Sequence, residues 1–285
     1  MMRRRSDMRP KKKDAYLTGT AGPIGDFEWN GGKMNILAIG NSFSEDATRY
    51  LHQIARSDKY DLTVVNLYIG GCPLSRHYRN MLSGEKAYSL MVNGYDTRFT
   101  VTLKEALLNR DWDFAVMQQV SHQSIDYETY QPYLSELSAY VRKCVPGAKQ
   151  VIHQTWAYEQ GSKRLCEELG YRDPKDMYLD LENAYSMASK DIGAYGLIPS
   201  GELFQKLILT GVTKLYRDTF HASLGLGRYA LALLWYKVFT GNPVMHNSFC
   251  DFDEAVSKEK IFLVKEVVDQ YTGFIVPADF AIQRA

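Results

Sequence analysis

The sequence predicts a three-layer α/β/α sandwich built around a mainly parallel sheet of about five strands. Short apolar runs alternate with helical patterns along most of the 285 residues, and this alternation is typical of βαβ units. Crossovers between parallel strands are right-handed, so helices are expected on both faces of the sheet. No linker rich in Pro, Gly or Ser divides the middle of the chain. One domain is therefore predicted at residues 34–285.

The strands are predicted from apolar runs that end at charged or turn-forming residues. The first run, residues 36–39, lies between Lys33 and Gly40 and is typical of a buried strand. In chain order, strands are expected at 35–39, 62–68, 113–117, 149–153 and 193–198.

Helical periodicity occupies the segments between these strands. Helices are expected at 46–57, 101–109, 130–143 and 177–191. A strongly apolar helix is predicted at 223–239, with a stripe formed by Leu224, Leu231, Leu234 and Val238. A last helix at 254–271 is expected to pack on the outside.

Residues 1–33 differ in composition from the rest of the chain. Three arginines at 3–5 and three lysines at 11–13 precede a glycine-rich stretch with few apolar residues, which predicts a disordered basic arm. Such an arm could bind nucleic acid or a membrane surface, although a solvated tail is the simpler interpretation. No apolar core follows the basic cluster, so a secretory signal is not predicted.

Composition limits the classes of function. With 45% hydrophobic and 24% charged residues, the chain is an ordinary globular protein. A formal net charge of +1 gives no general case for nucleic-acid binding, and no apolar run has the length of a membrane span. The four cysteines lack C-x-x-C spacing, which favours a reduced, cytoplasmic protein. Nothing in the sequence indicates an oligomeric state.

Two distant segments carry the residues of a candidate catalytic site. Ser42 follows the first strand, and Asp218 and His221 precede the long apolar helix. Serine needs a base that is oriented by a third group before it can act as a nucleophile. Open α/β sheets bind ligands at the carboxyl ends of their strands, where these three residues are expected to meet. The pattern indicates a serine hydrolase.

Each residue also has a simpler interpretation. Ser42 and Glu45 fit a capping box at the start of a helix. Asp218 could cap the helix that follows it, and His221 could be a solvated loop residue. The catalytic interpretation is favoured because the informative segments all fall at the ends of predicted elements that share one sheet edge.

Three blocks of the sequence resemble those of the SGNH (GDSL) hydrolases. They are Gly40-Asn41-Ser42 after the first strand, Ile69-Gly70-Gly71-Cys72-Pro73-Leu74 after the second, and Asp218-x-x-His221 near the end. The resemblance spans roughly residues 34–245 and is greatest to an uncharacterised bacterial branch that carries G-N-S-F-S. It implies a flavodoxin-like SGNH hydrolase fold and a serine esterase with Ser42 as nucleophile, His221 as base and Asp218 as its orienting group.

The chain departs from the family pattern in two places. Asn41 replaces the aspartate that usually precedes the serine. The third block, normally G-x-N-D, has no asparagine: His122 falls at its position by register, while Gln119 and Gln123 carry the better-matched amide. The resemblance implies an oxyanion hole formed by the backbone N–H groups of Ser42 and Gly71. A side chain from Gln119, His122 or Gln123 is expected as a third donor.

The resemblance to carbohydrate esterases implies an O-acetyl group on a sugar as substrate. Trp156 and Tyr158 are expected near the mouth of the site and Asn41 inside it, as substrate-binding residues. Aromatic faces suit sugar rings, but packing in the core is the more common role of such residues. The expected partner is a small-molecule or carbohydrate ester, with no metal, cofactor, nucleic acid or membrane involved.

Three alternatives remain open. Cys72 lies in the glycine block and could be a nucleophile, although packing is the simpler role. A flavodoxin-like module could hold a phosphate at residues 40–44, but this leaves Asp218 and His221 unexplained. The third alternative is a catalytically impaired scaffold that only binds a glycan, and the incomplete third block favours it.

Overall fold

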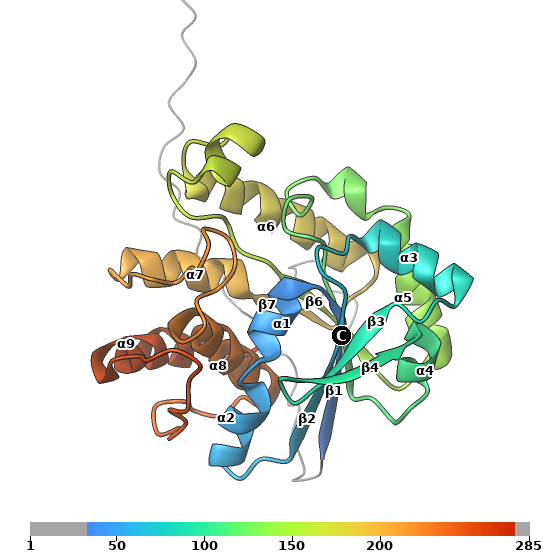
Figure 1. Cartoon of the computed structure of the whole chain (residues 1–285), viewed down its shortest axis with the longest axis horizontal. Helices are drawn as coiled ribbons and strands as arrows, with labels where there is room; N and C mark the ends of the chain where they lie inside the picture. Colours follow the sequence, from blue (N-terminus) through green and yellow to red (C-terminus); the bar gives the residue numbers. More distant parts are fainter. Residues whose placement is uncertain (1–32, 277–285) are drawn as a thin grey trace, which may run out of the picture.

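The computed structural model of the chain describes residues 33–276, and these form a layered α/β structure around one sheet (Figure 1). The sheet has seven strands in the order β4-β3-β2-β1-β5-β6-β7. The strands are β1 (Met34–Gly40), β2 (Leu62–Tyr68), β3 (Tyr88–Val92), β4 (Tyr95–Val101), β5 (Phe114–Met117), β6 (Lys149–Gln154) and β7 (Gly196–Pro199). Strands β2, β1, β5, β6 and β7 run parallel, while β3 and β4 are antiparallel.

The predicted fold class is confirmed, and all five predicted strands are present. The number of strands was wrong, because the hairpin of β3 and β4 adds two antiparallel strands beside β2. Most of β4 is exposed at the edge of the sheet. An exposed edge strand does not need the apolar periodicity by which buried strands are found in a sequence.

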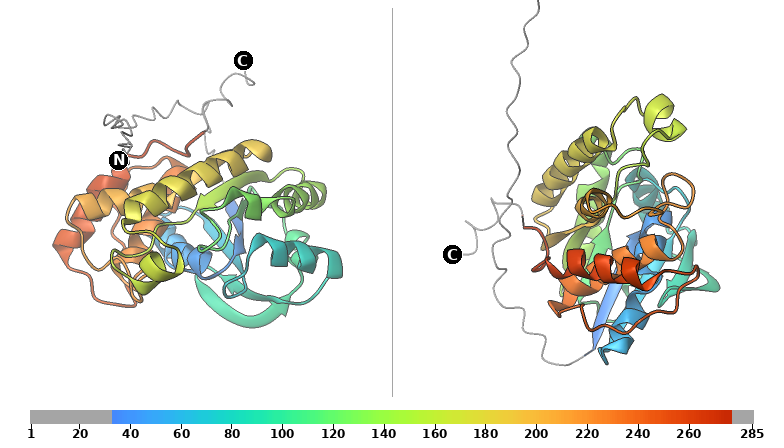
Figure 2. Two further views of the ribbon diagram at one scale, coloured as in Figure 1. Left: turned by 90° about the horizontal axis from the view of Figure 1, so that it is seen from above. Right: turned by 90° about the vertical axis from the view of Figure 1, so that its left-hand side faces the viewer.

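Helices cover both faces of the sheet, as Figures 1 and 2 show. One layer contains α1 (Ser42–Thr48), α2 (Leu51–Ser57), α7 (Ser200–Leu209), α8 (Leu226–Thr240) and α9 (Lys258–Asp269). The other contains α3 (Leu74–Ser83), α4 (Leu103–Leu107), α5 (Tyr133–Cys144) and α6 (Pro174–Asp191). Short helices also form at Tyr127–Tyr130 and Arg164–Glu168.

Several helix predictions need correction. The segment 46–57 contains two helices, α1 and α2, which are separated at residues 49 and 50. Helices α3 and α7 were not predicted: α3 begins directly after Pro73 and α7 directly after Pro199, so neither has a separate N-terminal signal from a capping side chain.

Helix α8 forms the centre of its layer. The predicted apolar helix is present, but it begins at Leu226, so Leu224 of the predicted stripe lies before it. Every residue from Leu226 to Phe239 is buried, so the buried surface is not confined to one stripe. The reason is that α1, α2, α7 and α9 pack around α8, in addition to the sheet beneath it. Its buried cations Arg228 and Lys237 are paired with Asp46 and Asp269, respectively, as buried charges require.

The two edges of the sheet differ from a regular ladder. In β4, Arg98 has a positive φ of 63° and its N–H donates to Asp96 Oδ1 at 2.8 Å. At the opposite edge, Leu197 of β7 forms an antiparallel bridge with Ile275 through reciprocal backbone hydrogen bonds of 2.9 and 3.0 Å. These contacts occupy backbone groups that an edge strand would otherwise leave free.

The predicted basic arm at residues 1–33 lies outside the described residues except for Lys33, and it stays a prediction. None of the helices within residues 33–276 combines the length and the apolar character needed to cross a membrane.

Candidate active site

Ser42 is the first residue of α1, directly beyond the carboxyl end of β1. The N-cap of α1 is Asn41, whose side-chain oxygen accepts the Phe43 N–H at 3.0 Å. Ser42 therefore does not cap the helix, and the capping-box interpretation of this serine was wrong. Because the cap is supplied by its neighbour, the Ser42 hydroxyl is available for another partner.

That partner is His221. Ser42 Oγ lies 2.8 Å from His221 Nε2, and His221 Nδ1 lies 2.7 Å from Asp218 Oδ2. The structure thus brings Ser42 together with two residues that follow it at a distance of up to 179 positions in the sequence. Nucleophile, base and orienting carboxylate within hydrogen-bond distance form the arrangement that activates a serine hydroxyl.

Asp218 is held by His221 in two ways. Its Oδ1 accepts the His221 backbone N–H at 2.9 Å, while Oδ2 faces the imidazole. Burial raises the pKa of Asp218, but these two hydrogen bonds, together with the charges of His221 and Arg217, outweigh it and leave the pKa below its usual value. The carboxylate therefore stays ionised and can stabilise an imidazolium. Since α8 begins at Leu226 with Gly225 as N-cap, Asp218 does not cap that helix.

The loop that carries the Asp and His is tightly closed. Tyr216 and Ala222 form an antiparallel bridge at its base, and Arg217 N donates to His221 O at 3.1 Å. Between them Thr219 has a φ of 75°, which is unfavourable for a β-branched residue. This conformation turns the chain so that the Asp218 carboxylate reaches both donors of His221.

A buried ionic cluster joins this loop to α1. Asp46 is fully buried and accepts from Arg217 at 2.8 and 2.9 Å and from Arg228 Nε at 2.8 Å. It also accepts the Ala222 backbone N–H at 3.1 Å. Asp46 lies one helical turn after Ser42, so one helix carries both the nucleophile and the carboxylate that anchors the base's loop.

Two backbone N–H groups are free to bind an oxyanion. Within the described part of the chain, neither Ser42 N–H nor Gly71 N–H donates to another protein atom. Gly71 is exposed and has a φ of +59°, a conformation that glycine adopts without strain. These two N–H groups match the predicted backbone donors.

The side-chain donor predicted at Gln119 is not available. The Gln119 amide oxygen accepts from Leu74 N and Val120 N, both at 2.9 Å, and its Nε2 donates to Thr129. The residue is fully buried, so its amide supports the surrounding loops instead of facing a substrate. The prediction of Gln119 as an oxyanion donor was therefore wrong.

His122 and Gln123 remain candidates for the third donor. His122 is exposed and Gln123 half-buried, and neither side chain is hydrogen-bonded within residues 33–276. Partial burial and the nearby Arg164 guanidinium lower the pKa of His122. Arg164 lies 4.1 Å over the ring of Phe220, the neighbour of His221. Arg164 is thus near both His122 and the segment that carries His221.

The three residues predicted to bind substrate are buried instead. Asn41 and Tyr158 are each 1% exposed, and Trp156 is fully buried. Trp156 stacks on Phe43 at 4.2 Å and Tyr158 OH lies 2.9 Å from Ser121 Oγ. Because their polar atoms are bonded within the protein, these residues hold the loops of the site, and packing is the better interpretation of both aromatic residues.

The described residues near the site provide neither a reactive thiol nor a metal site. Cys72 is fully buried, and burial raises the pKa of its thiol to about 12, so this thiol is not a nucleophile. Among residues 33–276, no three His, Cys, Asp or Glu side chains are grouped so that they could hold a metal ion.

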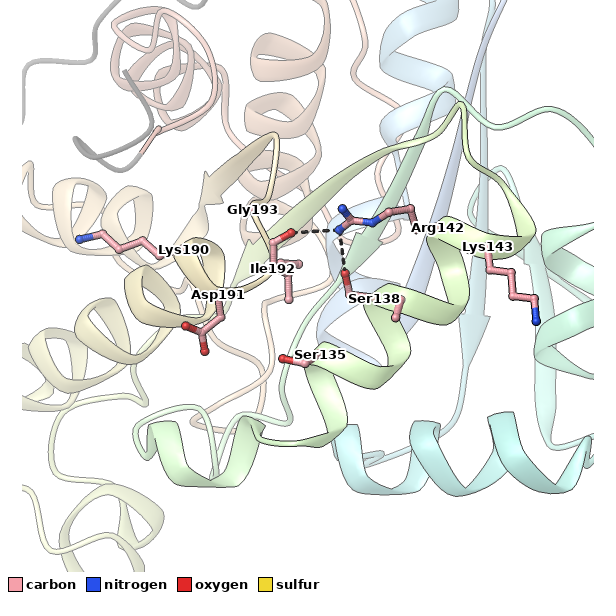
Figure 3. A pocket seen from close by; sticks show the side chains of 9 residues that line it. Ser135, Ser138, Arg142, Lys143, Lys190, Asp191, Ile192 and Gly193 are labelled. Atoms are coloured by element: carbon pink, nitrogen blue, oxygen red, sulfur yellow. Dashed lines mark hydrogen bonds between the residues drawn. The ribbon is translucent and has the colours of Figure 1, made fainter. Parts of the chain in front are cut away.

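A surface hollow of about 670 Å³ lies between α5 and the end of α6 (Figure 3). Arg142 crosses it and donates to Ser138 Oγ at 3.3 Å and to the Ile192 carbonyl at 3.1 Å. None of the triad residues lines this hollow. It is therefore a feature separate from the candidate active site.

The fold and site define an α/β protein with structural similarity to the SGNH hydrolases. A protein from Slackia heliotrinireducens, described as a candidate SGNH hydrolase, is 27% identical with a TM-score of 0.54, over 73% of this chain and 100% of that one. The chain belongs to the DUF4886 family, a domain of unknown function whose pattern matches residues 35–269.

A DUF4886 protein of known crystal structure, from Bacteroides uniformis, is 28% identical with a TM-score of 0.78. The match covers 87% of this chain and 99% of that one. No curated protein matches the sequence.

Sequence reasoning missed the residues beneath the nucleophile. Gln118, the first residue after β5, donates to Asn41 Oδ1 at 2.8 Å, and His153 near the end of β6 lies 2.6 Å from Gln118 Oε1. A signal existed, because both are polar residues at the carboxyl ends of central strands. Gln118 was not predicted because it does not match the asparagine of the third block.

Proposed function

We propose that this protein is a serine esterase that works through an acyl-enzyme. The observation that carries the proposal is the pair of hydrogen bonds that link Ser42 Oγ to His221 Nε2 at 2.8 Å and His221 Nδ1 to Asp218 at 2.7 Å. A serine in contact with an oriented imidazole, beside two free backbone donors, has the groups that acyl transfer requires.

In the proposed reaction, His221 Nε2 takes the proton of Ser42 as Oγ attacks the ester carbonyl carbon. The carbonyl oxygen becomes an oxyanion that accepts from the Ser42 and Gly71 N–H groups. As the intermediate collapses, the ester C–O bond breaks and the imidazolium returns its proton to the departing alcohol. Water then attacks the acyl-Ser42 ester by the same steps and releases the acid.

The finer proposal is that the substrate is an O-acetylated carbohydrate. Two half-buried polar side chains support the proposal that the alcohol part of the substrate carries further hydroxyl groups. They are Glu45 on α1 and Tyr68 at the end of β2. Neither side chain is hydrogen-bonded within the described residues. Burial raises the pKa of Tyr68, and the nearby Glu45 carboxylate adds to this effect. Such groups can accept from and donate to sugar hydroxyls.

The test is hydrolysis of p-nitrophenyl acetate by the protein and by its Ser42→Ala and His221→Ala variants. Loss of activity in both variants is expected, together with covalent labelling of Ser42 by a fluorophosphonate in the wild type only. Activity that survives both substitutions would overturn the assignment of the site. Release of acetate from acetylated xylo-oligosaccharides, compared with acetylated glycerol, tests the finer proposal.

One observation favours a second candidate function. The third block carries no asparagine, and the amide of Gln119, one of the three predicted side-chain donors, is fully bonded within the protein. The second candidate is a glycan-binding module that has lost catalysis. It predicts calorimetric binding of a glycan with neither hydrolysis nor fluorophosphonate labelling of Ser42.

A further inference from the structure

A chain of four hydrogen bonds runs beneath the nucleophile from α7 to the glycine loop. Ser200 Oγ lies 3.0 Å from His153 Nε2, and His153 Nδ1 lies 2.6 Å from Gln118 Oε1. Gln118 Nε2 then donates to Asn41 Oδ1 at 2.8 Å, and Asn41 Nδ2 donates to the Cys72 carbonyl at 3.1 Å. These hydrogen bonds thereby join strand β6, through His153, to the segments that follow β7, β5, β1 and β2.

The direction of every bond follows from the last acceptor. A backbone carbonyl can only accept, so Asn41 must turn its amide nitrogen toward Cys72 and its oxygen toward Gln118. Gln118 then donates to Asn41 and presents its own oxygen to His153, which must carry its proton on Nδ1. His153 Nε2 is left to accept the Ser200 hydroxyl. One arrangement of protons satisfies all five groups.

The chain is shielded from water along its length. His153 and Ser200 are fully buried, Gln118 is 2% exposed and Asn41 1% exposed. Gly40 makes this possible, because a Cβ at that position would lie 2.5 Å from Ser44 Oγ and 3.2 Å from Gln118 Cδ. Buried amides with all partners satisfied form rigid networks.

We infer that this chain of hydrogen bonds is a positioning device. It sets the distance between the two halves of the oxyanion hole, the N–H groups of Ser42 and Gly71. The inference rests on the esterase function proposed above. Asn41 touches both halves: it accepts the N–H of Phe43, next to Ser42, and it donates to the carbonyl of Cys72, next to Gly71. The hydrogen bonds through Ser200, His153 and Gln118 fix the plane of the Asn41 amide. Asn41, Gln118 and His153 are thus positioning residues.

The inference gives a reason for asparagine at position 41. A carboxylate there would still accept from Phe43 N and Gln118 Nε2, but it has no N–H for the Cys72 carbonyl. Two oxygens with lone pairs would then face each other across a buried contact. The glycine loop is expected to move away from Ser42, and a displacement of about 1 Å in such a site costs on the order of a hundredfold in rate.

The experiment uses Asn41→Asp, His153→Leu and His153→Asn in the full-length protein. Values of kcat and KM for p-nitrophenyl acetate are measured together with hydrogen exchange of the Cys72 amide, whose N–H donates to Ile69 O at 3.2 Å. The matched control is Gln150→Leu. Gln150 is also a buried amide bonded at both ends, to Ser138 Oγ at 2.5 Å and to Ser138 O at 2.8 Å, but it has no contact with the chain.

A fall in kcat of roughly tenfold to a hundredfold is expected for Asn41→Asp and His153→Leu, with KM within threefold. Exchange of the Cys72 amide should speed up in both. His153→Asn should recover most of the activity, because its amide nitrogen can replace Nδ1 as donor to Gln118. Gln150→Leu should lower stability and leave kcat unchanged.

Wild-type kcat and unchanged Cys72 exchange in Asn41→Asp and His153→Leu would overturn the inference. Equal losses in His153→Asn and His153→Leu would do the same, since they would show that donation to Gln118 is not what matters. A wild-type protein that neither hydrolyses esters nor reacts with a fluorophosphonate overturns the proposed function instead. The exchange rate of Cys72 in Asn41→Asp then decides on its own whether the chain holds the glycine loop.

Discussion

Trp156 donates its indole N–H to the carbonyl oxygen of Phe220 at a distance of 2.8 Å. This bond joins the segment after β6 to the residue next to His221, and a second bond, from Glu159 N to Thr219 O at 2.8 Å, runs parallel to it. The Trp156 ring also stacks on Phe43, the neighbour of Ser42. One buried side chain therefore contacts both the helix that carries Ser42 and the loop that carries His221.

The Trp156→Phe substitution separates positioning from substrate binding. It keeps most of the ring packing and removes the donor to Phe220. The free energy of unfolding should fall by about 1 kcal/mol, and kcat should fall several-fold with KM unchanged, because the base loses one restraint. Steady-state kinetics and urea unfolding check this. A raised KM for a sugar ester with unchanged kcat would show instead that Trp156 contacts the substrate.

Ser42 and Ser44 should respond to alanine in opposite ways. Ser42→Ala removes the proposed nucleophile but no cap, so turnover should disappear while Tm stays within a few degrees. Ser44 Oγ is buried, 2.7 Å from Asn66 Oδ1 and 2.9 Å from Asn41 O. Ser44→Ala should therefore destabilise the protein by about 1–2 kcal/mol. Thermal melts and esterase assays of both variants measure the contrast, and a large loss of Tm in Ser42→Ala would contradict the assignment.

Asp218→Asn tests the group that orients the imidazole. The amide can still meet the His221 backbone N–H, but it cannot stabilise an imidazolium and it favours the wrong tautomer. A fall in kcat of roughly 10³–10⁴-fold is expected, with stability little changed because Asp218 is largely exposed. The exposed Asp251 offers the control Asp251→Asn. A loss of less than tenfold in Asp218→Asn would argue that Asp218 does not act in the reaction.

Asp46→Asn should destabilise the protein far more than the neighbouring Glu45→Gln. Asp46 is fully buried between Arg217 and Arg228, and removal of its charge takes the carboxylate partner from Arg217 and leaves Arg228 its ion pair with Asp253. A loss of about 3 kcal/mol in the free energy of unfolding is expected. Glu45 has no side-chain hydrogen bond in the described residues, so Glu45→Gln should stay within about 0.5 kcal/mol. Similar losses in both variants would contradict this view of the cluster.

Stability should fall as the pH drops from about 6.5 toward 3. Burial lowers the pKa of both His77 and His153 to about 3, whereas a histidine in the unfolded chain takes up a proton near pH 6.5. Between these values the unfolded state binds more protons, so acid favours unfolding, and the effect levels off below about pH 3.

Urea unfolding at pH 7, 5.5 and 4.5 measures this dependence. The control is the His77→Gln/His153→Asn double variant, which should show a shallower loss between pH 6.5 and 4.5. Carboxylates with lowered pKa, such as Asp218 and Asp253, act in the same direction only at lower pH. An equal slope in the wild type and the double variant would exclude the buried histidines as its source.

The parallel core of the fold could be predicted from sequence because its strands are buried on both faces. The strands β1, β2, β5, β6 and β7 each contain a short run of apolar residues, and such runs between turn-forming or charged residues are distinctive. The β3–β4 hairpin could not be found in this way, since an exposed strand such as β4 carries Asp96, Thr97 and Arg98 without a buried face. An exposed edge strand forms because its backbone pairs with the neighbouring strand, and the apolar periodicity of one sequence does not indicate such pairing.

The grouping of Ser42, His221 and Asp218 could be predicted because a serine hydrolase would need these residue types, and because the residues lie near the ends of predicted elements. The supporting residues could not, because an amide or an indole has no sequence signature for its partner. Asn41 and Trp156 were expected to meet the substrate, yet both are buried in contacts with other loops. Which way a polar side chain turns is decided by segments far away in the chain.

The two altered edges of the sheet also affect how copies of this protein can meet. A straight edge strand recruits strands from neighbouring chains and is a common start of aggregation. At one edge the Arg98 N–H donates to Asp96 of the same strand, and at the other edge Ile275 is hydrogen-bonded to the backbone of Leu197. Within the described residues these contacts interrupt the regular backbone edge of the sheet on both sides, which makes the addition of a strand from a neighbouring copy less favourable.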